Sequence, residues 1–434
     1  MTSTGRSKRV ALIVLLNLVI LECCCAAVLL WARSSRSEYF SGHFDRLVRS
    51  VDQELIESVE TTGYDAHLGW DRQPNQLRNR TNSAGVPYTE TYDELGARTN
   101  AQYAETLAAA SYGDSHTVCS EVNDDETWQY YLSRSLEANV RNFGVGGYGP
   151  GQALLKLERH FEAGIAAPVV ILGVHEENLN RALNTYRPFY LNTYRSLNSN
   201  HLGSRLAFKP RFVVEDGGAR VEPNPLRSLS SVDDLLTALE MARHTDYWYQ
   251  FHSNGLEVGF PFSLKSLDLL LRVLDRTGIL KHPTRSGRLE LHSLWNDSAA
   301  VAVMAAITER YVQLARERGF RAVLLFLPAL SSLRADRSAE PGYRSFAVEL
   351  RQRYEPSDLV VLEFPGESID LSRFSVRHDG GHASAYGNQA IAQWLEAQLG
   401  DTLLRSRAGD EGVGSREPGQ RSGSRLPQPL RYGL

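Results

Sequence analysis

The sequence predicts an α/β protein, a three-layer α/β/α domain with a central parallel sheet, preceded by one N-terminal transmembrane helix. Three observations support this class: short apolar runs alternate with helix-like segments, polar or glycine-rich loops follow the runs, and a long apolar segment stands near the N-terminus. Such alternation is typical of a parallel sheet with helices on both faces. Ligands of these sheets bind at the carboxyl ends of the strands, so functional residues are expected in the loops there.

The composition is that of a globular protein with a large core. The chain has 434 residues, of which 42% are hydrophobic and 23% charged. Its net charge of −4 argues against a nucleic-acid partner, which would require a basic face to neutralise phosphates. Cys119 is the single cysteine outside the N-terminal apolar run, so the remainder of the chain cannot form an internal disulfide, and we expect a buried structural thiol.

Residues 10–31 form the apolar run, interrupted by Asn17 and Glu22. About 20 such residues cross a bilayer as a helix. Three basic residues lie in the preceding segment 1–9, which the positive-inside rule keeps in the cytoplasm. We therefore predict a signal anchor, with the rest of the chain periplasmic or extracellular. A cleaved signal peptide is the alternative, although the run is long for one.

Segment 32–100 is expected to lead from the membrane to the main domain. Residues 37–60 have apolar positions at helical spacing and predict an amphipathic juxtamembrane helix that lifts the domain off the membrane. Residues 61–100 are polar and turn-rich, and no element is predicted there. The main domain is placed at 101–402, with an insertion or cap at about 180–294. A tail at 403–434 is predicted to be disordered because it has few apolar residues.

The first half of the domain contains three predicted strands, each followed by a polar or glycine-rich loop. Residues 107–112 are followed by Gly-Asp-Ser-His-Thr at 113–117, and residues 139–143 by a glycine loop at 144–151 and a helix at 152–161. Residues 168–172 form a buried strand that ends in the loop 173–178.

The inserted region and the second half complete the pattern. The insertion is expected to hold a hairpin at 209–221 and helices at 232–241 and 264–274. The alternation then resumes with a helix at 298–318, strands at 322–327 and 359–362, and a last helix at 387–399.

Two loops carry residues suited to nucleophilic catalysis. Ser115 follows the first strand, where a hydroxyl can be presented beside the free N–H groups of a following helix. Near the end of the chain, Asp379 and His382 form an Asp-x-x-His loop. A carboxylate on one imidazole nitrogen leaves the other free to take a proton from a serine. Each motif alone is also compatible with an ordinary turn.

Together these blocks resemble the SGNH/GDSL hydrolase superfamily. The family blocks correspond to Gly113-Asp114-Ser115, to Asn142 with Gly147, to the loop 173–176, and to Asp379 with His382. The resemblance covers about residues 107–178 and 320–399, and implies the family's SGNH, flavodoxin-like fold. The third block departs from the family, because His175 stands where the family has an Asn, and Asn178 follows three residues later.

The resemblance implies an exported serine esterase that works through an acyl-serine on acyl, most simply O-acetyl, esters of a cell-envelope or exported glycan. Ser115 would be the nucleophile, His382 the general base and acid, and Asp379 the group that orients the imidazole. The backbone N–H groups of Ser115 and Gly147, with the side chain of Asn178 or His175, would form the oxyanion hole. No cofactor and no metal are implied. The expected partners are the membrane, an acylated small molecule or polysaccharide, and envelope or glycan-export machinery.

Several alternatives remain open. An O-acyltransferase would use the same acyl-serine, and a non-catalytic glycan-binding module could use the same fold. Aromatic clusters at 186–190 and 247–251 read either as a sugar-stacking platform that includes Trp248 or as the insertion's own core. Residues 144–149 also match a Gly-x-Gly-x-x-Gly dinucleotide fingerprint. A zinc site would have to gather His175, Glu176, Asp379 and His382.

Overall fold

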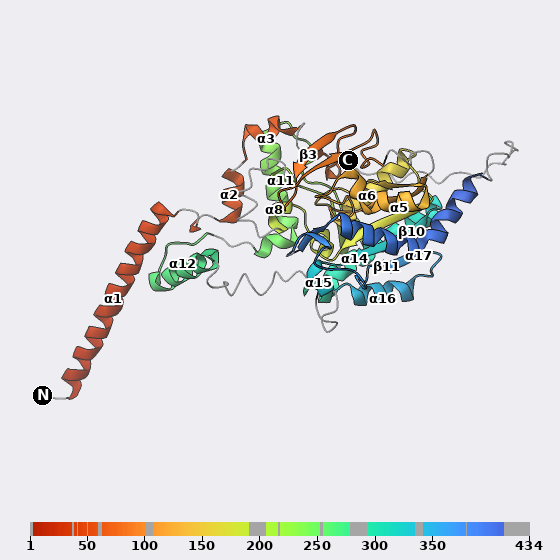
Figure 1. The fold of residues 1–434 in the computed structure, drawn as a ribbon. Coiled ribbons are helices and arrows are strands. Elements are labelled where there is room, and N and C mark those ends of the chain that lie inside the picture. Colours follow the sequence, from red (N-terminus) through yellow and green to blue (C-terminus); the bar gives the residue numbers. More distant parts are fainter. Residues whose placement is uncertain are drawn as a thin grey trace.

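The computed structural model describes residues 3–36, 39–40, 42–49, 51–59, 63–100, 107–190, 205–215, 218–251, 255–277, 293–334, 342–378 and 380–411. Within these ranges the chain is a mixed α/β protein with a five-stranded parallel sheet and one long apolar helix at its N-terminal end (Figure 1). The predicted α/β class is therefore confirmed.

The sheet has the strand order β11-β10-β7-β5-β6, and every pairing is parallel. In chain order this is the 2-1-3-4-5 arrangement of a doubly wound sheet, whose direction of winding reverses between β5 and β7. Strand β7 extends to His175, beyond the predicted end at residue 172, because Gly173 and Val174 still pair with β10. The strands are β5 (Leu107–Tyr112), β6 (Asn139–Asn142), β7 (Val169–His175), β10 (Arg321–Leu327) and β11 (Val360–Glu363).

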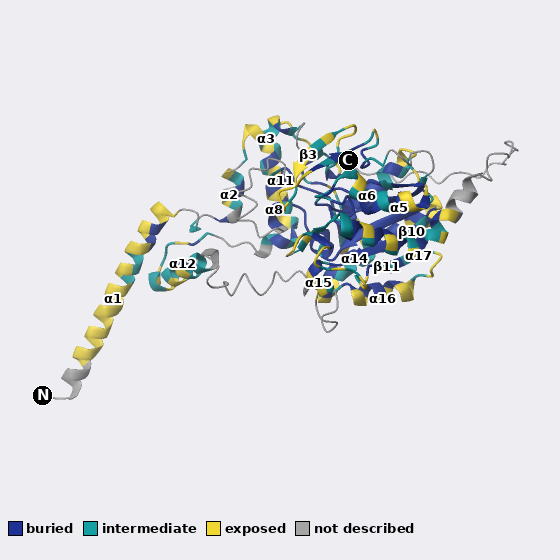
Figure 2. Ribbon diagram, in the orientation of Figure 1, coloured by how far each residue is buried: buried dark blue, intermediate teal, exposed yellow. Residues whose placement is uncertain are grey.

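Helices cover both faces of the sheet, and each face has its own core (Figure 2). Side chains alternate between faces along a strand, so Leu172 and Leu324 enter one core whereas Ile171 and Val323 enter the other. The first core includes residues of α6 (Pro150–Glu162) and α14 (Ser298–Arg318), and the second includes residues of α5 (Trp128–Leu136) and α17 (Ala385–Glu411).

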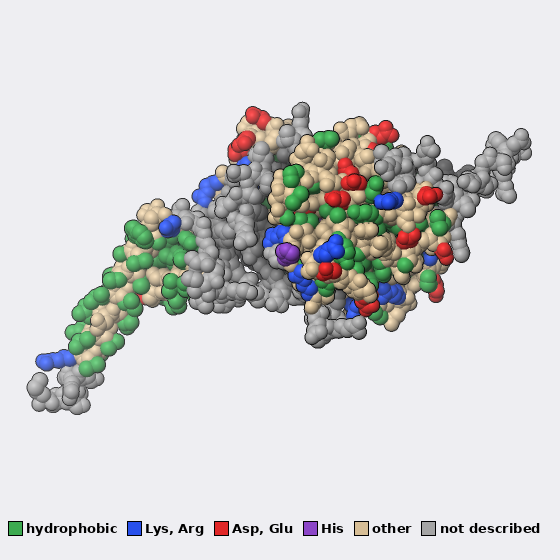
Figure 3. Space-filling view, in the orientation of Figure 1, with side chains coloured by type: hydrophobic (Ala, Val, Ile, Leu, Met, Phe, Trp, Pro, Cys, Tyr) green, Lys and Arg blue, Asp and Glu red, His purple; other side chains and the backbone are tan. Residues whose placement is uncertain are grey.

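Helix α1 (Ser3–Ser35) is long and apolar enough to cross a membrane, and most of its apolar side chains are exposed. It projects from the domain, and α12 (Phe262–Thr277) packs beside it (Figure 1). On the face of the molecule seen in Figure 3, α1 is coated with hydrophobic side chains, whereas the domain carries acidic and basic side chains intermingled.

The segment between α1 and the sheet is packed onto the domain. In place of one helix over 37–60, the described residues form α2 (His43–Arg49) and α3 (Gln53–Glu57), the latter capped by the Asp52 carboxylate. Leu47 and Leu55 are fully buried in the main core, so these helices pack on the domain. Residues 63–91, for which no element was predicted, contain two hairpins: β1 (Tyr64–Asp65) with β2 (Gly69–Trp70), and β3 (Leu77–Thr81) with β4 (Pro87–Thr91).

The inserted region contains the predicted hairpin, β8 (Arg211–Glu215) with β9 (Gly218–Glu222), and α11 (Val232–Thr245). Trp248 is 2% exposed and its indole N–H donates to the Asn180 carbonyl, so it is a core residue and offers no platform for a sugar. Helix α17 continues to Glu411, past the predicted end at 399. The remaining elements are η3 (Asp124–Glu126), α7 (Asn178–Ala182), α8 (Arg187–Tyr190), η4 (Tyr247–Phe251), η5 (Ser293–Asn296), α15 (Leu330–Arg334), α16 (Arg344–Arg353), β12 (Ser375–Arg377) and β13 (Gly380–Ala383).

Candidate active site

Ser115 lies in a compact turn at the carboxyl end of β5, next to the point where the winding of the sheet reverses. The turn is closed by two backbone hydrogen bonds, from Ser120 N–H to the Ser115 carbonyl (3.0 Å) and from Val118 N–H to the Asp114 carbonyl (2.9 Å). Ser115 is 9% exposed, and within the described part of the chain its hydroxyl makes no hydrogen bond. The hydroxyl is thus held in place by the backbone and left unengaged.

The glycine loop after β6 packs backbone to backbone against this turn. A Cβ on Gly144 would lie 2.4 Å from the Val118 nitrogen, and the Val145 N–H donates to the Gly113 carbonyl at 3.0 Å. The contact with Val118 explains why residue 144 is a glycine. Among the described residues, neither the Ser115 N–H nor the Gly147 N–H has a hydrogen-bond acceptor. Two backbone donors are therefore unused beside the serine.

His382, on strand β13, is bound to a carboxylate from the serine turn. Its Nδ1 lies 2.8 Å from Oε2 of Glu121. Burial raises the pKa of Glu121, but hydrogen bonds from His382 and from Ser83, whose N–H lies 2.7 Å from Oε1, outweigh it and lower the pKa to about 2. An ionised carboxylate can only accept, so Nδ1 carries a proton, and in the neutral imidazole the lone pair is on Nε2.

The predicted partner of His382, Asp379, lies outside the described residues, and its role stays a prediction. The carboxylate seen on the imidazole is Glu121, which the sequence motifs did not single out. The turn that presents it has a left-handed backbone at Cys119 (φ 57°) and Glu121 (φ 78°). Non-glycine residues rarely adopt this conformation, and it is maintained only where the surroundings impose it.

Arg98 is the main support of that strained turn. Its guanidinium, with the residue only 2% exposed, donates to the carbonyls of Val118 (2.8 Å) and Cys119 (2.7 Å) and pairs with Asp124 (2.8 Å). It also donates to the Val122 carbonyl. The β3–β4 hairpin adds the bond from Ser83. The segment before the sheet is therefore part of the site, and not only a lead-in to it.

Two further histidines lie beside His382. The rings of His116 and His175 are stacked, with centroids 3.7 Å apart and planes 2° from parallel, and the His116 ring lies 5.0 Å from that of His382. Burial lowers the pKa of His175 to about 4. Burial, together with the neighbouring imidazoles, lowers the pKa of His116 to well below its ordinary value. Both rings are therefore neutral at pH 7, which lets three imidazoles share one site.

In the loop after β7, His175 and Asn178 have different hydrogen-bond partners. The Asn178 amide donates to the Asp114 carboxylate (2.9 Å) and accepts from the His175 N–H (2.8 Å), so it ties this loop to the serine turn. Arg181 adds a hydrogen bond to the same Asp114 oxygen at 3.1 Å. Nδ1 of His175 accepts from the Glu177 N–H (3.4 Å), which leaves the proton on Nε2. His175 is the member of the pair with a ring N–H to offer.

Arg187, at the start of α8, is a second residue that sequence reasoning missed. A Cβ built on Gly147 would lie 2.0 Å from its Nη1, so the guanidinium rests directly against the glycine loop. Gly147 also has a φ of +85°, a conformation that favours glycine. The Arg187 guanidinium therefore lies against the loop that carries the unused Gly147 N–H.

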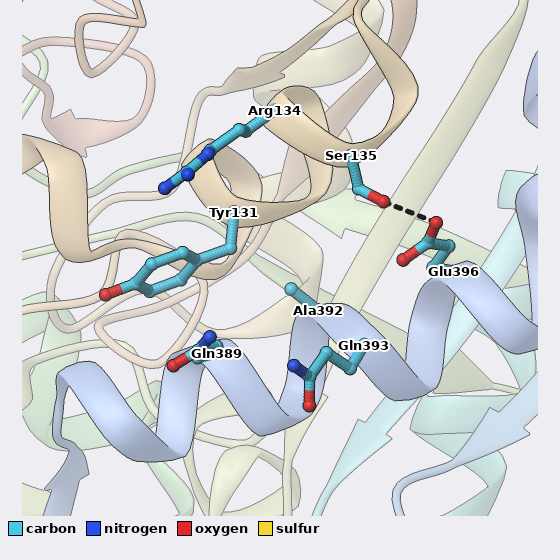
Figure 4. Close-up of a pocket in the computed structure, with 7 residues that line it drawn as sticks. All are labelled: Tyr131, Arg134, Ser135, Gln389, Ala392, Gln393 and Glu396. Carbon is cyan, nitrogen blue, oxygen red and sulfur yellow. Dashed lines mark hydrogen bonds between the residues drawn. The ribbon is translucent and has the colours of Figure 1, made fainter.

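Other features of the described residues lie apart from this cluster. A cavity of about 330 Å³ between α5 and α17 is lined by none of the residues above (Figure 4). In the ranges given above, no three His, Cys, Asp or Glu side chains form a metal-binding group. Burial raises the pKa of the Cys119 thiol to about 12, so this cysteine is unreactive.

Comparison with known proteins does not identify a family. No family model matches this sequence, and no curated protein matches it. The class of the protein must therefore be argued from the geometry of the cluster.

Proposed function

We propose that the protein is a membrane-anchored serine esterase of the SGNH/GDSL type, which cleaves acyl esters through an acyl-serine intermediate. One observation carries the proposal: a serine with an unengaged hydroxyl shares a single turn with Glu121, whose ionised carboxylate binds Nδ1 of His382. Carboxylate, imidazole and serine at the carboxyl edge of a doubly wound sheet are the parts that this chemistry requires.

In this mechanism the Ser115 oxygen attacks the ester carbonyl carbon, and its proton passes to Nε2 of His382. Glu121 keeps the other nitrogen protonated and stabilises the imidazolium that forms. The tetrahedral intermediate expels the alcohol, which takes the proton from His382, and leaves the acyl group on Ser115. Water then attacks the acyl-serine and gives a proton to His382. The second tetrahedral intermediate expels the Ser115 oxygen, which takes that proton back from His382, so that the acid and the free serine are released.

The negative charge of the tetrahedral intermediate requires donors, and three support its binding. The N–H groups of Ser115 and Gly147 are unused, and the third donor is assigned to Nε2–H of His175, since the Asn178 amide is engaged with Asp114 and the His175 N–H. Arg187 adds positive charge beside Gly147. Donors of this kind are worth about 3 kcal/mol each in comparable hydrolases.

The location and the substrate remain as the sequence predicts them. Helix α1 is compatible with a single-pass anchor, and the basic residues before it support placing the domain outside the cytoplasm. An O-acetylated envelope glycan is still the proposed substrate, but the burial of Trp248 removes the sugar-stacking platform that the sequence offered as one reading of the aromatic clusters. Transfer to a sugar hydroxyl would replace water in the second step.

The proposal is tested by labelling the full-length protein with a fluorophosphonate, which reacts with activated serines. We expect one labelled residue, Ser115, and no label in Ser115→Ala. Ser120→Ala is the matched control, because Ser120 lies on the same turn and contacts Ser115 only through its backbone N–H. Absence of label in folded wild-type protein, or label that persists in Ser115→Ala, would contradict the proposal.

A further inference from the structure

Helix α12 lies outside the sheet domain, against the membrane-length helix α1 (Figure 1). Leu256 and Leu269 form a small separate core with Leu29 and Ala32 of α1. The first turn of α12 runs in the same direction as α1, since Phe262 and Ser263 bond to Glu22, and the Ser266 hydroxyl donates to the Cys25 carbonyl at 3.4 Å. The start of α12 therefore lies beside the middle of α1, at Glu22.

Glu22 links the start of α12 to the interior of the apolar run. Its carboxylate accepts from the N–H groups of Phe262 (2.5 Å) and Ser263 (3.3 Å) and from the Ser263 hydroxyl. It is the one charged residue of segment 10–31. Glu22 lies nine residues before Trp31, or about 13 Å along the helix axis, which is inside a hydrocarbon layer about 30 Å thick.

A carboxylate at that depth is costly unless it is paired. Every hydrogen bond given above to the Glu22 carboxylate comes from α12, whose N-terminal N–H groups also favour a negative charge. If α12 stood in water, away from the bilayer, Glu22 would be left in hydrocarbon without these donors. The first turn of α12 and Glu22 must consequently lie at the same depth.

The opposite face of α12 is apolar and uncovered. Leu264, Leu267 and Leu270 are 61%, 50% and 51% exposed, and repeat every three residues along one side of the helix. On α1, which packs beside α12, Leu30 is 58% and Trp31 67% exposed. Helix α12 also carries charged residues, among them Lys265 near its start. Arg272 pairs with Asp268 at 3.1 Å, and long basic side chains can reach the headgroup level.

We propose that α12 is a second membrane element, an amphipathic helix that enters the bilayer beside α1 with Leu264, Leu267 and Leu270 against the acyl chains. The occupant of the exposed face is thus lipid hydrocarbon. This holds the domain at the membrane surface at two points, α1 and α12. The inference rests on α1 crossing a membrane and is independent of the chemistry at Ser115.

Photocrosslinking of the full-length chain in phosphatidylcholine–phosphatidylglycerol vesicles tests it. Benzoylphenylalanine is placed at Leu267, or at Met241 of α11, which is comparably exposed at 49% but lies on the domain. Lipid adducts are counted by mass spectrometry, and thermal unfolding confirms that each variant is folded. We expect about tenfold more lipid adduct at Leu267, because in the proposed arrangement the exposed apolar face of α12 lies among acyl chains.

Equal adduct yields at the two positions would overturn the proposal, and so would adducts at Leu267 that join two copies of the chain, since a second copy would then cover the face. A pair of variants checks the role of Glu22 by the same readout. Glu22→Ala should sharply lower the lipid adducts at Leu267, whereas Glu22→Gln, which keeps an acceptor oxygen, should retain most of them. Adducts that are unchanged in Glu22→Ala would show that Glu22 does not set the depth of α12.

Discussion

Replacing Glu121 by Gln separates the carboxylate seen on His382 from the one predicted by motif. The pKa of Glu121 lies at about 2 against an ordinary 4.5, which corresponds to a preference of about 3 kcal/mol for the ionised form. Glutamine fills the same space without that charge and can present its amide N–H to Nδ1, which favours the wrong tautomer. Loss of the carboxylate together with the wrong tautomer predicts a fall in kcat of up to about 10⁴-fold.

The assay is hydrolysis of p-nitrophenyl acetate by the full-length protein, with KM measured alongside kcat. Glu121→Gln should lower kcat and leave KM nearly unchanged, because Glu121 acts through His382. Asp379→Asn should remain close to wild type. The opposite pattern, a large loss in Asp379→Asn and little change in Glu121→Gln, would refute our assignment and restore the carboxylate that the Asp-x-x-His motif predicts.

Three further predictions concern stability. His175 has a pKa of about 4 in the folded protein against an ordinary 6.5, so the unfolded chain binds the proton more readily. The free energy of unfolding should be greatest above pH 6.5 and fall by up to about 3 kcal/mol as the pH drops to 4. Urea titrations of His175→Asn should show a smaller dependence on pH. Asp246→Ala should cost about 3 kcal/mol or more in the same titrations, because the carboxylate accepts the buried N–H groups of Thr185, Tyr186 and Trp248; a loss below 1 kcal/mol would contradict this. Gly144→Ala should lower both the melting temperature and kcat, since its Cβ would meet the Val118 nitrogen, whereas Gly259→Ala, which meets nothing within 4 Å, should change neither.

The regular elements of this fold could be predicted because each depends on a local pattern. The buried runs at 107–112 and 322–327 and the helix at 298–318 have the lengths and apolar spacing of the elements observed. The segment 63–100 could not be predicted in this way. It is shaped by distant partners, such as the buried Lys156, which pairs with Asp71 at 2.6 Å, and its own sequence carries no period.

The site was predictable only where a motif marks it. Ser115 and His382 lie in loops that match a motif. Glu121 is positioned by a turn with left-handed backbone, which Arg98 stabilises from the segment before the sheet. Arg187 belongs to the inserted region and contacts the glycine loop. No spacing rule connects these residues. A search for acidic residues within a few positions of a candidate nucleophile is the sequence signal that would have pointed to Glu121, six residues after Ser115.

The residues of the candidate site are synthesised at different times. Ser115 and Glu121 belong to one short turn near the start of the sheet, whereas His382 lies 261 residues after Glu121 and arrives with one of the last elements of the chain. Under the proposed function, a nascent chain would contain the nucleophile Ser115 and the carboxylate Glu121 during most of its synthesis, but not yet the base His382. Reactivity would appear only when the C-terminal hairpin docks, so that incomplete or truncated chains are inert towards acyl groups around them.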